Sequence, residues 1–224
     1  MIKAVLFDLD DTLYLERDYV HGAFLRVADE VESLGFRAAC ALDSYFMSVW
    51  DHEGRDRVLD KAADRLGFPA EWVPRLVDAF RDHDPDIRLF PEVRTVIERL
   101  RADYRLALIT DGHAEVQRRK IRKLELDSMI DCIIIADDYG RSHWKPDPLP
   151  FATACSKLGV SPGEAVMVGD NPERDVRGAK GLKMKSVRLR RPLGYFFTLE
   201  AAPEDEPDHE ISDLLGLLSL LERL

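Results

Sequence analysis

The chain has 224 residues, of which 46% are hydrophobic and 33% are charged, and its 32 basic and 42 acidic side chains give a formal net charge of −10. Such a length can bury one good hydrophobic core and a second small module. The excess of acidic side chains, with no long run of Lys or Arg, excludes general binding to nucleic-acid phosphates. The longest apolar stretches, residues 132–136 and 214–221, are too short for a membrane span of roughly 18 residues.

The N-terminal segment and the cysteines indicate the compartment. The first apolar run reaches acid at Asp8, before a signal-peptide core of about 7–15 apolar residues has formed. Cys40, Cys132 and Cys155 are odd in number, far apart and set among apolar residues, which is typical of reduced core thiols. We therefore expect a cytoplasmic protein with no membrane partner.

Short apolar runs alternate with helical periods along most of the chain. The runs are residues 3–7, 105–110, 132–136, 165–170 and 185–189. Near-continuous Val, Ile and Leu is typical of strands that are buried on both faces of a parallel sheet. Apolar residues at helical spacing separate the later runs. The sequence therefore predicts an α/β fold with a doubly wound, Rossmann-like and mostly parallel sheet.

Residues 16–83 interrupt this alternation, because they contain four helical patterns and no strand. We interpret them as a helical module inserted after the first strand, with a return linker rich in Pro and charge at residues 84–88. The expected boundaries are 1–14 and 89–224 for the sheet domain and 15–88 for the helical module. At the other end of the chain, an amphipathic helix is expected over residues 211–224.

Polar residues follow the predicted strands at their carboxyl ends, where open α/β sheets bind ligands. The segment Asp8-Leu9-Asp10-Asp11-Thr12 places acids two residues apart directly after the first strand. It is not an EF-hand calcium loop, because Leu13 stands where that loop requires Gly. The later polar positions are Thr110 followed by Asp111-Gly112, Lys145 before Pro146, and Gly169-Asp170 with Asp175.

These motifs, in this order, resemble those of the haloacid dehalogenase (HAD) superfamily of phosphohydrolases. The resemblance covers the whole chain, because the helical module looks like the family's cap domain of the first type. Each later motif is weak alone, but four motifs in order on consecutive strand ends are highly specific. The matching residues are Asp8-Leu9-Asp10-Asp11-Thr12, Thr110, Lys145, and Asp170 with Asp175.

The resemblance implies a Mg²⁺-dependent phosphatase that hydrolyses a small phosphorylated metabolite through an aspartyl-phosphate intermediate. It implies that Asp8 is the nucleophile and a metal ligand. Asp10 would act as general acid and then base, with its backbone carbonyl on the metal. Thr110 would bind a phosphoryl oxygen, and Lys145 would neutralise the charge shared by phosphate and Asp8.

The metal would also be held by acids from the last motif. The resemblance implies that Asp170 binds Mg²⁺. It leaves open whether Asp175 is a metal ligand or a partner that orients Lys145. Carboxylates crowded at one sheet edge repel by roughly 4 kcal/mol per pair at 4 Å in an effective dielectric of about 20. A hard cation with oxygen ligands removes this repulsion, and Mg²⁺ accepts such ligands together with phosphate oxygens.

Four residues are candidates for substrate binding. Asp111 and Gly112, beside Thr110, are candidate substrate-binding residues, as are His52 and Arg55, which lie where the helical period of the module breaks. We expect the protein to be a monomer or a homodimer.

Three other activities are less favoured. Sugar phosphomutases of the family often have Gly and Val in place of Asp11 and Thr12. Dehalogenases of the family lack the second acid of the first motif, which is present here as Asp10. A non-catalytic phosphate-binding regulator would have no use for both Asp8 and Asp10.

Overall fold

A computed structural model describes all 224 residues, which divide into two compact units. We call Met1–Glu16 together with Ile87–Leu224 the core unit, and Arg17–Asp86 the cap unit. Each unit has its own hydrophobic interior, and each is described by itself.

The core unit is built on one six-stranded sheet in which every neighbouring pair of strands is parallel. The strand order is β3-β2-β1-β4-β5-β6, which confirms the predicted doubly wound arrangement. The central strand β1 places Leu6 opposite Ala107 on one side and Met167 on the other. The strands are β1 (Ala4–Phe7), β2 (Arg105–Thr110), β3 (Cys132–Ile135), β4 (Ala165–Gly169), β5 (Lys185–Leu189) and β6 (His209–Ile211).

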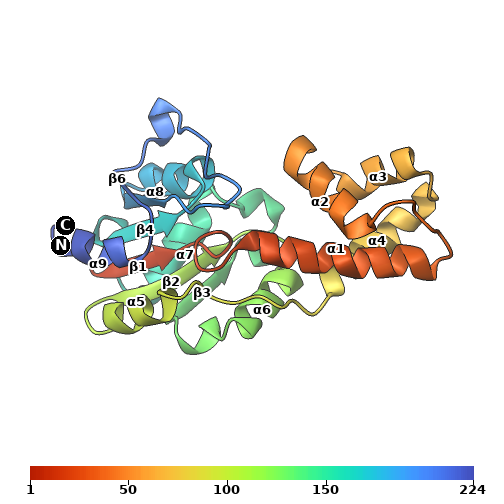
Figure 1. Cartoon of the computed structure of the whole chain (residues 1–224). Coiled ribbons are helices and arrows are strands. Elements are labelled where there is room, and N and C mark those ends of the chain that lie inside the picture. Colours follow the sequence, from red (N-terminus) through yellow and green to blue (C-terminus); the bar gives the residue numbers. More distant parts are fainter. The chain divides into compact units, whose positions relative to one another are not determined.

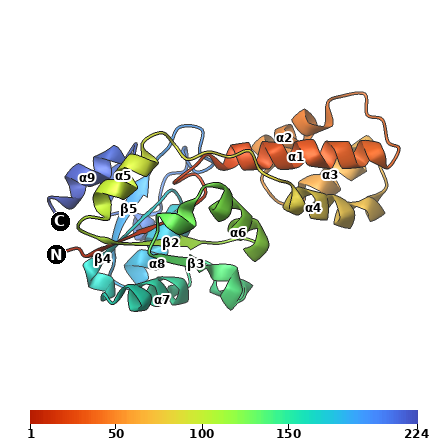
Figure 2. The same cartoon turned by 90° about the horizontal axis from the view of Figure 1, so that it is seen from below.

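Helices cover both faces of this sheet (Figures 1 and 2). Figure 2 shows α5 and α9 on one face and α7 and α8 on the other. The helices of the core unit are α5 (Val93–Leu100), α6 (Ala114–Lys123), α7 (Pro148–Leu158), α8 (Arg177–Gly181) and α9 (Leu215–Leu221). The expected helix over residues 211–224 is thus shorter than predicted, because Ile211 belongs to β6 and the helical turns begin only at Leu215.

Alternate side chains of each strand point to opposite faces of the sheet, so both faces must be apolar. On the face covered by α7, Leu6, Ile109 and Met167 form a cluster with Phe151 and Cys155 of that helix. Cys132 and Cys155 are buried thiols, as the sequence predicted. Cys40 is free and exposed, so its prediction as a core thiol was wrong.

The cap unit consists of α1 (Glu16–Ser33), α2 (Leu42–Glu53), α3 (Val58–Leu66) and α4 (Val73–Asp82). The ring of Phe24 on α1 packs against α2 and α4, since it lies 5.5 Å from the ring of Phe46 and 5.2 Å from that of Phe80. Gly67 ends α3 with a left-handed φ of 83°, a conformation that glycine adopts without steric cost. Across both units, every helix is too short or too polar to cross a membrane.

Candidate active site

The predicted site residues gather where the strand order reverses in the middle of the sheet. Asp8 directly follows the central strand β1, Thr110 is the last residue of β2, and Asp170 directly follows β4. Because all strands are parallel, these three residues lie at the same edge. Ligands of open α/β sheets bind in the crevice at this position.

Lys145 is anchored by three oxygens at this edge. Its side chain is buried, and its Nζ donates hydrogen bonds to Asp8 Oδ1 at 2.5 Å, Asp175 Oδ1 at 2.7 Å and the Ile109 carbonyl at 3.2 Å. Burial disfavours the charged ammonium, but the carboxylates of Asp175 and Asp8 outweigh it and raise the pKa of Lys145. Lys145 therefore carries a positive charge against the Asp8 carboxylate.

Asp175 is held on both of its oxygens. Oδ1 accepts from Lys145, and Oδ2 accepts from the backbone N–H of Asn171 at 3.1 Å. Its carboxylate packs directly on Gly169, where any Cβ would overlap it. The contact between Asp175 and Lys145, left open by the sequence, is present in the structure.

Asp8, Asp170 and Asp175 form an acidic cluster. Each offers a carboxylate oxygen, and these three atoms lie within 4.8 Å of one another. Burial raises the pKa of Asp8 well above its ordinary value; Lys145 opposes this rise and Asp175 adds to it. Burial, with the charges of Asp8 and Asp175, also raises the pKa of Asp170. Three carboxylates against the ammonium of Lys145 leave two excess negative charges, and an all-oxygen donor set of this charge fits a divalent hard cation.

Asp10 lies beside this cluster in a network of its own. Its Oδ1 accepts from Lys120 Nζ at 2.6 Å and from the Tyr14 hydroxyl, and its Oδ2 accepts from Gln117 Nε2 at 2.8 Å. Burial raises the pKa of Asp10, but the charge of Lys120 and these hydrogen bonds outweigh it, so that the pKa is lowered. Gln117 also contacts Thr110 Oγ1 at 2.5 Å.

Tyr14, Gln117 and Lys120 were not predicted as site residues from the sequence. A signal was present, because Gln117 and Lys120 share the buried stripe of α6 with Val116 and Ile121. Polar residues at buried helical positions require partners. Their partners could not be named without the fold, since Asp10 is 107 residues away from Gln117.

The turn that follows β1 is fixed by its own backbone and by a distant loop. Asp11 has a left-handed φ of 55° and is buried; its carboxylate accepts from the N–H groups of Glu16 at 2.9 Å and Tyr195 at 2.8 Å. The Arg191 guanidinium donates to the Thr12 carbonyl at 3.2 Å. These contacts hold the backbone between Asp8 and α1 in one conformation.

The residues predicted to bind substrate have different surroundings. Asp111 accepts from the backbone N–H of Lys145 at 3.0 Å and from Arg174 at 3.3 Å, and so braces the Lys145 loop. Gly112 has a φ of 107°. His52 and Arg55 belong to the cap unit. There His52 Nδ1 lies 2.8 Å from the Ser48 carbonyl, and the Arg55 guanidinium lies 5.3 Å from the Trp50 ring centroid. The role of these four residues in substrate binding stays a prediction.

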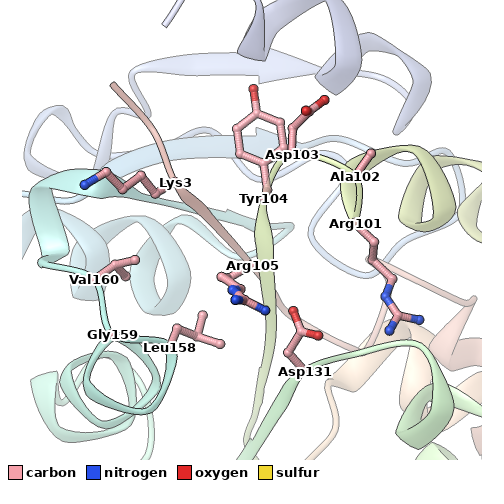
Figure 3. A pocket seen from close by; sticks show the side chains of 10 residues that line it. All are labelled: Lys3, Arg101, Ala102, Asp103, Tyr104, Arg105, Asp131, Leu158, Gly159 and Val160. Atoms are coloured by element: carbon pink, nitrogen blue, oxygen red, sulfur yellow. The ribbon is translucent and has the colours of Figure 1, made fainter.

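A hollow of about 630 Å³ opens at the other edge of the sheet, at the amino ends of β1 and β2 (Figure 3). Its lining carries charges of both signs, among them Lys3, Arg105 and Asp131. Lys3 is paired with Glu164 at 2.5 Å, and Asp131 accepts from the Leu106 backbone N–H at 2.9 Å. Its lining does not include Asp8, Asp10, Asp170 or Asp175. The candidate catalytic residues thus all lie at the carboxyl ends of the strands, away from this hollow.

Comparison with known proteins identifies this arrangement. A family model described as haloacid dehalogenase-like hydrolase matches residues 2–183. The phosphoserine phosphatase of Thermus thermophilus is 31% identical, over 95% of this chain and 96% of its own length. The glyceraldehyde 3-phosphate phosphatase of Pyrococcus abyssi is 34% identical, over 99% of this chain and 94% of its own length.

Among solved structures, the HAD-hydrolase YfnB of Bacillus subtilis, bound to magnesium, has the same fold with a TM-score of 0.76. It is 16% identical and covers 98% of each chain. With the motifs on consecutive strand ends and phosphatase relatives over nearly the full length, the chain belongs to the haloacid dehalogenase-like hydrolases and is a phosphoric monoester hydrolase of that family.

Proposed function

We propose that this phosphatase is Mg²⁺-dependent and hydrolyses a small phosphomonoester metabolite through an aspartyl-phosphate on Asp8. The proposal rests on the position of the Asp8 carboxylate, which accepts a hydrogen bond from the Lys145 ammonium and lies in one acidic cluster with Asp170 and Asp175. A carboxylate nucleophile needs nearby positive charge when it attacks an anionic phosphoryl group, and this edge of the sheet can supply it.

In the first step, an oxygen of Asp8 attacks phosphorus and the bond from phosphorus to the leaving oxygen breaks. Asp10 donates its proton to that oxygen. In the second step, water attacks the phosphorus of the aspartyl-phosphate, Asp10 takes the proton of the water, and Asp8 is released as a carboxylate. Thr110 donates a hydrogen bond to a phosphoryl oxygen, and Lys145 balances the charge shared by the phosphoryl group and Asp8.

Asp8, Asp170 and the backbone carbonyl of Asp10 would hold Mg²⁺. Bound there, the ion supplies positive charge that lowers the repulsion between the acidic side chains and the phosphate. For Asp175 we favour the orienting role, because one of its oxygens contacts Lys145 and the other a backbone N–H. The magnesium bound to the Bacillus subtilis relative supports the choice of ion.

The relatives support the substrate class. The Thermus thermophilus and Pyrococcus abyssi proteins are named for phosphoserine and glyceraldehyde 3-phosphate, two small monoesters of a primary alcohol. A small phosphorylated metabolite of this kind is the substrate that we infer. His52 and Arg55 in the cap unit are the residues that we expect to distinguish its leaving group.

The test is phosphate release from a panel of small phosphomonoesters, with Mg²⁺ and with excess chelator. We expect activity only with the metal, and a loss of more than about 10³-fold in kcat for Asp8→Asn, because an amide is a poor nucleophile. Asp103→Asn, an exposed change at the opposite edge of the sheet, is the matched control. Full activity in chelator, or near wild-type turnover by a folded Asp8→Asn variant, would contradict the proposal.

A further inference from the structure

The carboxylate of Asp10 is held by three side chains from two segments of the core unit. Tyr14 comes from the turn after β1, and Gln117 and Lys120 come from α6. Gln117 and Lys120 are only 1% and 3% exposed. A buried amide and a buried ammonium cost free energy unless they are hydrogen-bonded, and Asp10 provides both of them with an acceptor.

The hydrogen bonds make the two oxygens of Asp10 unequal. A carboxylate oxygen has about two acceptor positions. Both positions on Oδ1 are filled, by Lys120 at 2.6 Å and by the Tyr14 hydroxyl. Oδ2 accepts only from Gln117 at 2.8 Å. One acceptor position on Oδ2 is therefore open, and this oxygen is the one that can exchange a proton.

Gln117 joins this oxygen to the phosphoryl-binding residue. Its Nε2 carries two N–H groups and lies 2.8 Å from Asp10 Oδ2 and 2.5 Å from Thr110 Oγ1. The amide nitrogen must face Asp10, because a carboxylate can only accept. One side chain thus sets the separation between the proton-exchanging oxygen and the hydroxyl expected to touch the phosphoryl group.

We propose that Gln117 and Lys120 are positioning residues that aim Oδ2 of Asp10 at the water which hydrolyses the aspartyl-phosphate. This inference rests on the proposed function. In this step the water oxygen forms a bond to phosphorus, its proton passes to Oδ2, and the electron pair of the breaking bond from phosphorus to oxygen returns to Asp8. Lys120 and Tyr14 hold Oδ1, so that rotation of the carboxylate is blocked while Oδ2 receives the proton.

The test measures formation and breakdown of the phosphoenzyme separately, using 4-nitrophenyl phosphate with Mg²⁺. The first equivalent of nitrophenolate reports formation, which needs no proton from Asp10 because a phenolate leaves unprotonated. Decay of the acid-quenched phosphoenzyme reports breakdown. For Lys120→Met we expect breakdown to slow by about tenfold or more and formation to change by less than about twofold. For Gln117→Leu, which also removes the contact with Thr110, we expect breakdown to slow by about tenfold or more and formation to slow less than breakdown.

Two further variants make the test specific. Lys120→Arg keeps a cation that can donate to Oδ1 and should recover part of the breakdown rate. Arg122→Met removes a cation from the exposed side of the same helix and should behave as wild type. If Lys120→Met folds poorly, the rates of formation and breakdown can be measured on Gln117→Leu and on the milder variant Tyr14→Phe instead.

Asp10→Asn separates failure of the inference from failure of the proposed function. An unchanged breakdown rate in Asp10→Asn would remove Asp10 from the proposed mechanism. Slow breakdown in Asp10→Asn with wild-type breakdown in Lys120→Met and Gln117→Leu would overturn the positioning role alone. Equal losses in both rates, with a smaller burst of nitrophenolate, would show that the two side chains only support the fold.

Discussion

Asp8 and Asp10 stand two residues apart after the same strand, yet their carboxylates have opposite surroundings. Asp8 faces Lys145 and two other acids, and burial raises its pKa. The side chains around Asp10 donate hydrogen bonds to it, and burial raises its pKa. The charge of Lys120 is the largest of the effects that outweigh burial, so that the pKa of Asp10 is lowered. In the proposed mechanism Asp8, held against the Lys145 ammonium, attacks phosphorus. The lowered pKa keeps Asp10 ionised, which is the form that takes the proton of the attacking water.

The position of Asp175 depends on the absence of a side chain at Gly169. A Cβ on Gly169 would overlap the Asp175 carboxylate, which accepts from Lys145. We expect Gly169→Ala to lower kcat by about tenfold or more and to destabilise the fold by about 1–3 kcal/mol, because overpacking displaces Asp175.

Gly163→Ala is the control for this change, because nothing lies within 4 Å of a Cβ at that position. It should leave both kcat and the midpoint of urea unfolding unchanged. Wild-type kinetics in Gly169→Ala would show that Asp175 does not need this packing, and would weaken its assigned role toward Lys145.

Among the elements, α1 and α4 of the cap unit are joined by a buried acid. Glu30 accepts from Arg26 on its own helix at 2.8 Å and from Arg75 of α4 at 2.6 Å. Burial raises the pKa of Glu30, but the hydrogen bonds from Arg26 and Arg75 outweigh it and lower the pKa. The ionised carboxylate therefore contributes to the packing of these helices.

We expect Glu30→Gln to lower the free energy of unfolding by about 1–2 kcal/mol at pH 7, as measured by urea denaturation. Because the folded pKa lies below the ordinary value of about 4.3, the stabilisation is complete above that pH and is lost as the pH falls through the folded pKa. The difference between wild type and variant should thus shrink near pH 3.

Glu32→Gln, an exposed change on the same helix, should have an effect below about 0.5 kcal/mol at either pH. A difference between wild type and Glu30→Gln that is equally large at pH 7 and near pH 3 would exclude the charge of Glu30 as its cause.

For the whole molecule, the fold was easiest to predict from the sequence where the burial of a strand requires a run of apolar residues. Strands that are buried on both faces are mostly apolar, so β1 to β4 were predictable from apolar runs in the sequence, whereas β5 shows this pattern only in part because it contains Lys185 and Arg188. The edge strand β6 was not, since it pairs only with β5 and its sequence His209-Glu210-Ile211 has one apolar residue. Cys40 lies between α1 and α2, where apolar neighbours in the sequence do not imply burial.

The residues of the candidate site, too, could be predicted from the sequence only in part. Residues at strand ends are brought together by sheet topology, so Asp8, Thr110 and Asp170 could be grouped before the fold was known. The partners of Asp10 come from a helix face, and their meeting depends on how α6 packs. Sequence spacing carries no information about that contact, which is why Gln117 and Lys120 emerge only from the structure.

In the proposed reaction the phosphoryl group passes through Asp8. A reaction with a small phosphomonoester and Mg²⁺, quenched in acid during a single turnover and mapped by peptide mass spectrometry, tests it most directly. We expect a phosphorylated peptide that contains Asp8 and is absent from the Asp8→Asn variant. Phosphate release with the phosphoryl group never found on Asp8, or found on another residue, would contradict it.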